Sequence, residues 1–335
     1  MKKILPVIIF TFLAVCLQTI GMEPAGADKP SALDMLKLRA DSGDSKALYR
    51  LAIYYEDNDS IPEALDRLHR SAMAGYAPAM NYLGYCYGSG HLGVRQDSDS
   101  ALWWIEKAAA ADEPDPKAFN NLGAMLLYGE LGVQQDYQKA LYWLKKGAEK
   151  GVPTSAAMTA RLYLEGLGTP MDTVSAMPYL RQAAKAGILD AAIELADIVI
   201  PRTDSLTPEA TFELALPYYY DRITPVAVPL IKRAADADIP LAVAILAQCT
   251  AEGIGVQYDY DRAIDLYAHA AALGEPHAQF ILAETLQSLP DLLAETHPEL
   301  PSAEILYEQA ASAGVTDAAE ALRPLRPFQS SIMER

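Results

Sequence analysis

The chain has 335 residues, of which 51% are apolar and 21% are charged, and its formal net charge is −17 at pH 7. This apolar share supports a large buried core and argues against a disordered chain. The excess of acids argues against nucleic acid as a partner, because binding phosphates requires clustered Lys and Arg. It also argues against docking on an anionic membrane through a basic face.

The first 27 residues have the features of a secretory signal. Lys2 and Lys3 precede an apolar run over residues 4–20, and Ala25-Gly26-Ala27 supplies the small residues of a cleavage site. The run is short for a membrane-spanning helix. We therefore expect residues 1–27 to be removed and the mature chain to be periplasmic or secreted.

A second interpretation of this segment remains open. Leu13-Ala14-Val15-Cys16 resembles a lipoprotein signal, in which the cysteine is acylated and becomes the mature N-terminus. Val15 departs from that pattern, since a small residue is usual before the cysteine. On this interpretation the protein is an outer-membrane lipoprotein, and the lipid on Cys16 is its link to the membrane.

An internal repeat organises the rest of the chain. A helix that ends in small residues and is followed by Gly or Asp recurs at intervals of 32 to 51 residues. The copies end at Gly43, Gly75, Asp112, Gly151, Gly187, Asp238, Gly274 and Gly314. Each repeat is predicted to contain two helices. Small residues on the first helix, as in Ala118…Leu122-Gly123, let its partner approach closely.

Helix caps mark the second helix of several repeats. An Asp lies four residues before an Ala that recurs in that helix from repeat to repeat, and its side chain can accept hydrogen bonds from free backbone N–H groups. These residues are Asp97, Asp136, Asp172 and Asp259. In the first repeat, Ser60 and Glu63 predict a capping box, with Pro62 in the first turn.

One repeat carries the fullest pattern. Its residues are Leu122-Gly123, Tyr128-Gly129, Leu131-Gly132-Val133, Asp136, Lys139-Ala140, Trp143-Leu144, Gly147-Ala148 and Gly151. With these residues the chain resembles the Sel-one-like repeat family, a branch of the tetratricopeptide-like helical arrays. The resemblance covers about residues 31–322 in about seven repeats. It implies an all-α fold, a right-handed α-solenoid of antiparallel helix pairs, and a role as an adaptor or scaffold for protein complexes.

These observations predict three parts. A signal peptide spans residues 1–27, the repeat solenoid spans residues 28–322, and a C-terminal tail spans residues 323–335. An insertion at about residues 201–221 enlarges the fifth repeat, and Tyr218, Tyr219 and Tyr220 are expected in an enlarged loop after a short helix.

No catalytic constellation emerges from the sequence. The five histidines have no metal-ligand spacing, and no Ser, His and Asp are placed as a nucleophile with its base. His91 is expected to face solvent in a turn. Cys86 and Cys249 share one repeat column, which indicates a buried apolar position. We therefore predict no enzyme activity, no cofactor and no metal site.

Partner-binding residues are predicted in three places. Trp103 and Tyr142 precede a core column and are expected to be exposed, and the three tyrosines of the insertion form a possible knob. The C-terminal third is acidic: between residues 234 and 322 the one base is Arg262, against 15 acids. Its candidate residues are Asp236, Glu252, Asp259, Asp261 and Asp265, which would attract a basic segment of a protein or peptide.

The sequence therefore favours an exported, non-enzymatic adaptor that binds a protein or peptide on the concave surface of the solenoid. The first alternative is a lipid-anchored scaffold of an outer-envelope export or assembly machine. The second, a cell-wall or β-lactam-active enzyme, rests on the family resemblance alone.

Overall fold

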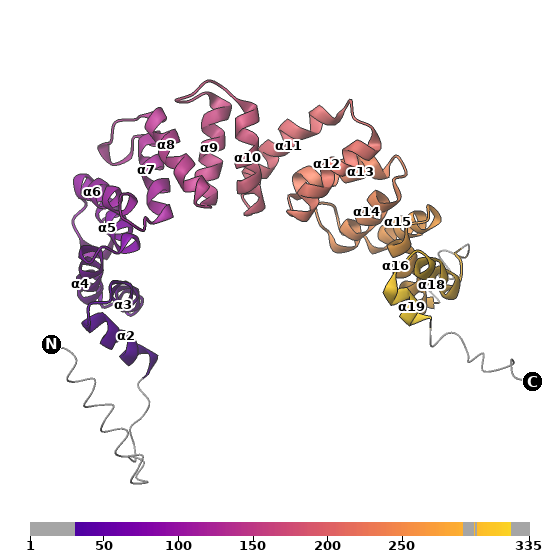
Figure 1. The fold of residues 1–335 in the computed structure, drawn as a ribbon, viewed down its shortest axis with the longest axis horizontal. Helices are drawn as coiled ribbons and strands as arrows, with labels where there is room; N and C mark the ends of the chain where they lie inside the picture. The colour runs from indigo at the N-terminus through magenta and orange to yellow at the C-terminus, as the bar shows by residue number, and fades with distance from the viewer. Residues whose placement is uncertain (1–30, 291–297, 299, 323–335) are drawn as a thin grey trace, which may run out of the picture. The chain divides into compact units, whose positions relative to one another are not determined.

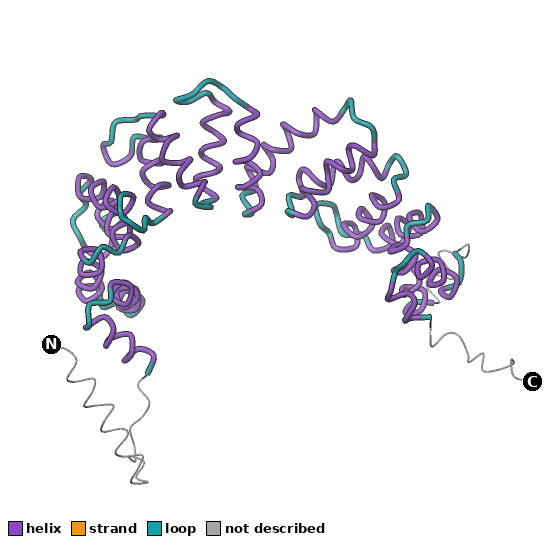
Figure 2. Tube along the Cα trace, viewed as in Figure 1, coloured by secondary structure: helices purple, strands orange, loops and turns teal. Residues whose placement is uncertain are grey.

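The computed structural model describes residues 31–290, 298 and 300–322. Within those residues every regular element is a helix, and none is a strand (Figure 2). The prediction of an all-α fold is confirmed. These described residues divide between residues 118 and 119 into two compact units, called here the N-terminal unit and the C-terminal unit. The predicted signal peptide, Cys16 and the tail lie outside the described residues.

The N-terminal unit is built from helices joined by short turns (Figure 1). They are α2 (Ala32–Asp41), α3 (Ser45–Asp57), α4 (Ile61–Met73), α5 (Ala77–Ser89), the 3-10 turn η1 (His91–Gly93) and α6 (Ser98–Ala109). Helix α3 pairs with α4, and α5 pairs with α6. Helix α2 packs on α3, and α4 packs on α5, so each pair is buried against its neighbour.

The C-terminal unit continues the same pairing. Its elements are α7 (Pro116–Tyr128, which begins in the N-terminal unit), η2 (Glu130–Gly132), α8 (Tyr137–Glu149), α9 (Pro153–Glu165), α10 (Thr173–Lys185), α11 (Leu189–Val199), η3 (Ile200–Thr203), α12 (Pro208–Tyr220), α13 (Thr224–Ala235), α14 (Pro240–Glu252), α15 (Tyr260–Ala272), α16 (Pro276–Ser288), α18 (Ala303–Ser312) and α19 (Thr316–Ala321). The pairs are α7–α8, α9–α10, α12–α13, α14–α15 and α16–α18.

The predicted insertion forms a helix of its own. Thr207 caps α12 by accepting a hydrogen bond from the backbone N–H of Ala210 at 3.3 Å. Helix α12 pairs with α13, while α11 packs on α10. The fifth repeat therefore has three helices. Tyr218, Tyr219 and Tyr220 form the last turn of α12, and their placement in a loop after a shorter helix was wrong.

A column of small residues sets the distance between paired helices. Its members are all buried: Ala52, Gly84, Gly123, Ala160, Ala196, Ala247 and Ala283. A Cβ added to Gly84 would lie 2.4 Å from Cγ1 of Ile105 and 3.0 Å from the carbonyl oxygen of Ala101. One added to Gly123 would lie 2.4 Å from Cγ of Leu144. At these two crossings the helices are closer than an alanine allows.

The predicted Asp caps are confirmed. Each side chain accepts a hydrogen bond from a backbone N–H in the first turn of its helix: Asp97 from Asp99, Asp136 from Lys139, Asp172 from Ser175, and Asp259 from Arg262. The capping box at Ser60 was wrong. The Ser60 hydroxyl points back to the carbonyl oxygen of Asn58 at 3.5 Å, and the side chain makes no cap bond.

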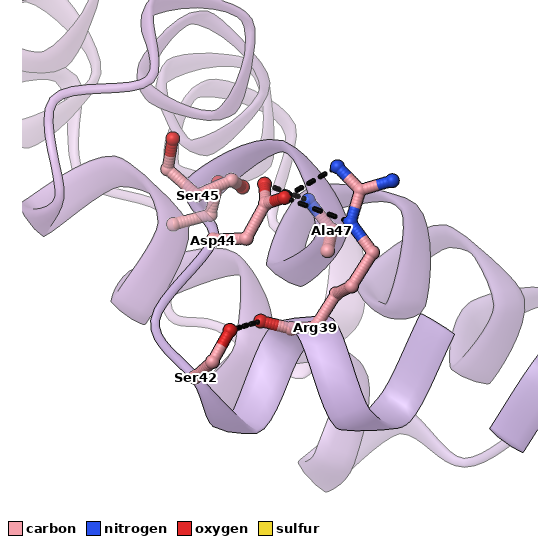
Figure 3. A network of polar contacts seen from close by, with 6 residues as sticks. Arg39, Ser42, Asp44, Ser45 and Ala47 are labelled. Carbon is pink, nitrogen blue, oxygen red and sulfur yellow. Dashed lines mark hydrogen bonds and ion pairs between the residues drawn. The ribbon is translucent and has the colours of Figure 1, made fainter. Parts of the chain in front are cut away.

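The turn between α2 and α3 shows how a cap also fixes a connection (Figure 3). One Asp44 oxygen accepts from the backbone N–H of Ala47 at 2.9 Å, and the other accepts from Arg39 Nε at 3.0 Å. The Ser42 hydroxyl donates to the carbonyl oxygen of Arg39 at 2.7 Å. The bond from Ala47 and then the Arg39 side chain lower the pKa of Asp44.

Replacing Gly84 by Ala tests the close approach of α5 and α6. In an exposed helix this change stabilises by about 1 kcal/mol. Here the new methyl group overlaps Ile105, so we expect a loss of about 1–3 kcal/mol in the free energy of unfolding, measured by urea titration. Adding Ile105→Ala to Gly84→Ala should cost less than the sum of the two single changes. A more stable Gly84→Ala variant would contradict the close approach.

Candidate functional site

A chain of touching aromatic rings covers part of the N-terminal unit. The ring of Tyr49 lies 5.5 Å from that of Tyr76 and 6.4 Å from that of Tyr82. The Tyr82 ring is stacked with Tyr85 at 5.9 Å and 4°, and His91 lies 5.6 Å from Tyr85. We call these five residues the tyrosine surface. Tyr85 is its most open member, with 52% of its surface exposed.

The carboxylate of Glu56 holds two members of this surface in place. Its Oε1 accepts a hydrogen bond from the Tyr82 hydroxyl at 2.6 Å and lies 2.7 Å from His91 Nε2. Burial, and then the bond to Glu56, raise the pKa of the Tyr82 phenol, so its hydroxyl stays a neutral donor. His91, which the sequence placed facing solvent, is partly buried and is held by this carboxylate.

No residue of the tyrosine surface was predicted from the sequence as a partner-binding candidate. The available signal was tyrosine density, since seven of the 19 tyrosines lie between residues 49 and 87. Repeat columns alone did not show which of these rings meet, because Tyr49, Tyr82 and Tyr85 occupy three different positions of their helices. Glu56 and His91 meet Tyr82 from other elements, and only the fold brings them together.

Two of the predicted aromatic residues lie exposed on second helices of the repeats. Trp103 on α6 is 49% exposed and Tyr142 on α8 is 52% exposed. Each ring is covered by the lysine one helical turn later: Lys107 Nζ lies 5.3 Å from the Trp103 centroid, and Lys146 Nζ lies 4.5 Å from the Tyr142 centroid. These cation–π contacts give both rings a partner within their own helix.

The three tyrosines of α12 have different environments. Tyr218 is 6% exposed and packs in the core, so its side chain is not accessible to a partner. The Tyr219 hydroxyl donates to Gln248 Oε1 on α14 at 3.1 Å. Tyr220 is 75% exposed. Of the predicted tyrosine knob, Tyr220 is thus the residue that the fold leaves open.

The acidic candidates do not form one group. Asp259 is the cap of α15, and Asp261 lies in the first turn of that helix. Glu252 ends α14 and accepts from Gln248 Nε2 at 2.9 Å. Asp236 is the C-cap residue of α13 and lines a cleft together with the basic residues Lys232 and Arg262. Asp265 lines a second cleft and pairs with Arg262. The fold therefore disperses these acids over several helix ends and two clefts.

Comparison with known proteins identifies the repeat. The Sel1 repeat model matches six segments, which together cover more than half of the chain. They are residues 45–62, 77–113, 116–152, 153–188, 240–275 and 300–315. The chain belongs to the Sel1 repeat family. Sel1 repeats typically mediate contacts between proteins.

Individual relatives are distant. An uncharacterized protein of Neisseria meningitidis serogroup B is 27% identical over 305 residues, which are 84% of this chain and 63% of that protein. This chain therefore spans less than two thirds of that relative's length. A protective antigen of uropathogenic Escherichia coli with an SLR fold is 26% identical, with a TM-score of 0.48, over 88% of this chain and 67% of that one. A Sel1 repeat protein from Oxalobacter formigenes is 25% identical, with a TM-score of 0.44, over 92% and 99%.

Both cysteines of the Sel1 array are free thiols in buried positions. Burial raises the pKa of Cys86 to about 12, with a smaller contribution from the charge of Glu56. Burial also raises the pKa of Cys249. Since the thiolate is the nucleophilic form, neither position favours thiol chemistry at neutral pH.

Among the described residues, no helix has the length and apolar character needed to cross a bilayer. In the same residues, His, Cys, Asp and Glu side chains nowhere gather in threes with the geometry of a metal site.

Asp221, beside the tyrosines of α12, gives a pH-dependent prediction. The side chains of Lys185 and Arg181, at 2.8 and 2.7 Å, lower its pKa. A lowered pKa stabilises the fold above the unfolded value of about 4, and this stabilisation is lost as the pH falls through the folded pKa. Asp221→Asn should therefore cost about 1 kcal/mol at pH 7 in urea unfolding and nothing at low pH.

Asp204 supplies the control for this variant. It pairs with Arg233 at 3.1 Å but is 80% exposed. Asp204→Asn should leave the stability nearly unchanged at both pH values, because exposed ion pairs contribute little. An equal cost for both variants, or a cost of Asp221→Asn that persists at low pH, would contradict the role of Asp221.

Proposed function

We propose that this chain is an exported, non-enzymatic adaptor that binds a protein or peptide on the concave surface of its Sel1 array. The observation that carries the proposal is the tyrosine surface of the N-terminal unit. Tyrosine offers a large, rigid apolar face with a hydroxyl at its edge, and it is enriched where proteins bind one another. Membership of the Sel1 repeat family supports the same general role.

The contacts within the tyrosine surface support binding rather than packing alone. The Glu56 carboxylate holds two of its side chains in place, because it contacts both the Tyr82 hydroxyl and His91 Nε2. The Tyr85 ring stacks on the Tyr82 ring and still exposes about half of its surface. A ring that is already ordered loses little conformational entropy when a partner covers it, and this favours affinity.

The alternatives have weaker support. A lipid-anchored scaffold would share the array and requires acylation of Cys16, so it differs from the main proposal in how the chain is held and not in how it binds. A cell-wall or β-lactam-active enzyme rests on the family resemblance alone, and the raised pKa of both buried thiols disfavours thiol catalysis.

Quantitative affinity capture tests the binding role. The mature chain would be immobilised and exposed to an extract of the producing cells, and captured proteins would be measured by mass spectrometry. We expect Tyr85→Ala to reduce capture of at least one protein by tenfold or more, since hot-spot residues contribute 2 kcal/mol or more. Tyr142→Ala is the matched comparison, because Tyr142 has the same exposed fraction and its ring is covered by Lys146. Identical capture by the wild type and Tyr85→Ala would contradict the role of the tyrosine surface.

Intact-mass measurement of the protein from fractionated cells tests export. We expect a chain that begins at Asp28, which corresponds to a periplasmic or secreted adaptor. An acylated chain that begins at Cys16 would instead support the lipid-anchored scaffold, and the Cys16→Ala variant should then lose the lipid. A mass that includes residues 1–27 would contradict both forms of export.

A further inference from the structure

The rings of the tyrosine surface form an unbroken series. Their centroids lie 5.5 Å apart for Tyr76 and Tyr49, 6.4 Å for Tyr49 and Tyr82, 5.9 Å for Tyr82 and Tyr85, and 5.6 Å for Tyr85 and His91. Tyr85 is exposed and the other four residues are partly buried, so each keeps some of its surface open to solvent. A ligand on this surface therefore meets several aromatic rings in succession.

Three hydroxyl groups of this surface are unused within the described part of the chain. The hydroxyl of Tyr82 donates to Glu56, but those of Tyr49, Tyr76 and Tyr85 take part in no hydrogen bond among the described residues. Tyr85 is exposed, and the oxygens of Tyr49 and Tyr76 are not fully buried, so all three hydroxyls are accessible. Each O–H can therefore donate to an acceptor that a ligand brings.

The carboxylates at this surface are bonded inside the protein. Burial raises the pKa of the Tyr49 phenol, and the nearby charges of Asp115 and Glu56 add to this effect. Glu56 accepts from the Tyr82 hydroxyl at 2.6 Å, and Asp115 is buried and accepts from Asn81 Nδ2 at 2.8 Å. Since both carboxylates already have partners, the surface disfavours a basic side chain as the main contact of a ligand.

The unused hydroxyls discriminate between kinds of ligand backbone. An α-helix uses its carbonyl oxygens within itself, so tyrosine hydroxyls beneath it would be buried without an acceptor. A β-strand binds by adding to the edge of a sheet, and the described part of this protein contains no strand. A polyproline II segment has no internal hydrogen bonds, so its carbonyl oxygens are free to accept. Its backbone is the one that the three hydroxyls match.

Proline side chains also suit the rings of this surface. The pyrrolidine ring is compact and apolar, and proline has no backbone N–H that would need an acceptor in the contact. A proline-rich segment is extended before it binds, so it loses little conformational entropy on binding. Surfaces lined with aromatic residues bind such segments in unrelated domains for these reasons.

We propose that the tyrosine surface binds a proline-rich segment of a partner protein. The rings of Tyr82 and Tyr85 contact the pyrrolidine rings, and the hydroxyls of Tyr49, Tyr76 and Tyr85 donate to backbone carbonyl oxygens of the segment. This proposal rests on the proposed function, that the Sel1 array binds proteins through this surface. It adds the kind of segment that is bound.

Fluorescence anisotropy with the mature chain tests the proposal. The probe is a labelled decaproline peptide, and the controls are a labelled Gly-Ser peptide of the same length and a labelled alanine-rich helical peptide. We expect the probe to bind and both controls to bind at least tenfold more weakly. Tyr85→Ala should weaken binding of the probe tenfold or more. Tyr142→Ala removes a ring with the same exposed fraction and should leave binding unchanged.

Tyr85→Phe separates the hydroxyl from the ring. Because this hydroxyl makes no bond among the described residues, the urea midpoint of the variant should equal that of the wild type. Loss of one hydrogen bond to the segment should weaken binding of the probe about two- to tenfold. Tyr142→Phe is the matched control and should change neither the midpoint nor the affinity. An unchanged affinity of Tyr85→Phe would contradict the role of the hydroxyl.

Four results would overturn the proposal. Three are no binding of the probe, equal binding of either control peptide, and binding that Tyr85→Ala leaves unchanged. The fourth is tighter binding after removal of residues 323–335, which would assign the surface to the prolines of this chain's own tail, Arg323-Pro324-Leu325-Arg326-Pro327. If Tyr85→Ala reduces capture from the extract while decaproline does not bind, the protein-binding role stands and a proline-rich ligand is rejected.

Discussion

The close approach of paired helices at one small-residue column is the constraint on which the rest of this protein depends. Where Gly84 faces Ile105 and Gly123 faces Leu144, there is no room even for a methyl group. This contact brings the first and second helix of a repeat together along their length and buries the leucine one residue earlier in the first helix, as at Leu83 and Leu122. Each pair then has one face left to bury against the next pair, and this makes the stability of a repeat depend on its neighbours.

Because that column is fixed, other columns are free to differ, and function depends on those. Tyr49 on α3 and Tyr82 and Tyr85 on α5 belong to one surface. Glu56, also on α3, joins this surface to the η1 turn by contacting both Tyr82 and His91. On the second helices one column changes from Trp104 and Trp143 to Leu266 and Leu306. The tyrosine surface is suited to a protein partner, and Sel1 repeats typically mediate contacts between proteins.

The sequence predicted what repeats in this fold, and missed what occurs once. The helix pairs, the Asp caps and the burial of Cys86 and Cys249 follow from columns, because identical local chemistry recurs in register. Helix α12 was missed as a partner of α13, since the interval between repeats shows an insertion but not how its chain packs. The tyrosine surface was missed because its rings come from different columns. Asp238 was visible as a substitution for glycine, but its left-handed backbone and its place at a cleft required the fold.

The central claim is that a protein partner lies against this array in the cell. Site-specific photo-crosslinking tests it directly: a photoreactive amino acid replaces Tyr85 or Trp103 in turn, and adducts are identified after irradiation of living cells. The account predicts a covalent adduct with a distinct protein at Tyr85 and none at Trp103, which lies outside the tyrosine surface. Absence of a protein adduct at Tyr85, in cells that make the folded chain, would contradict it.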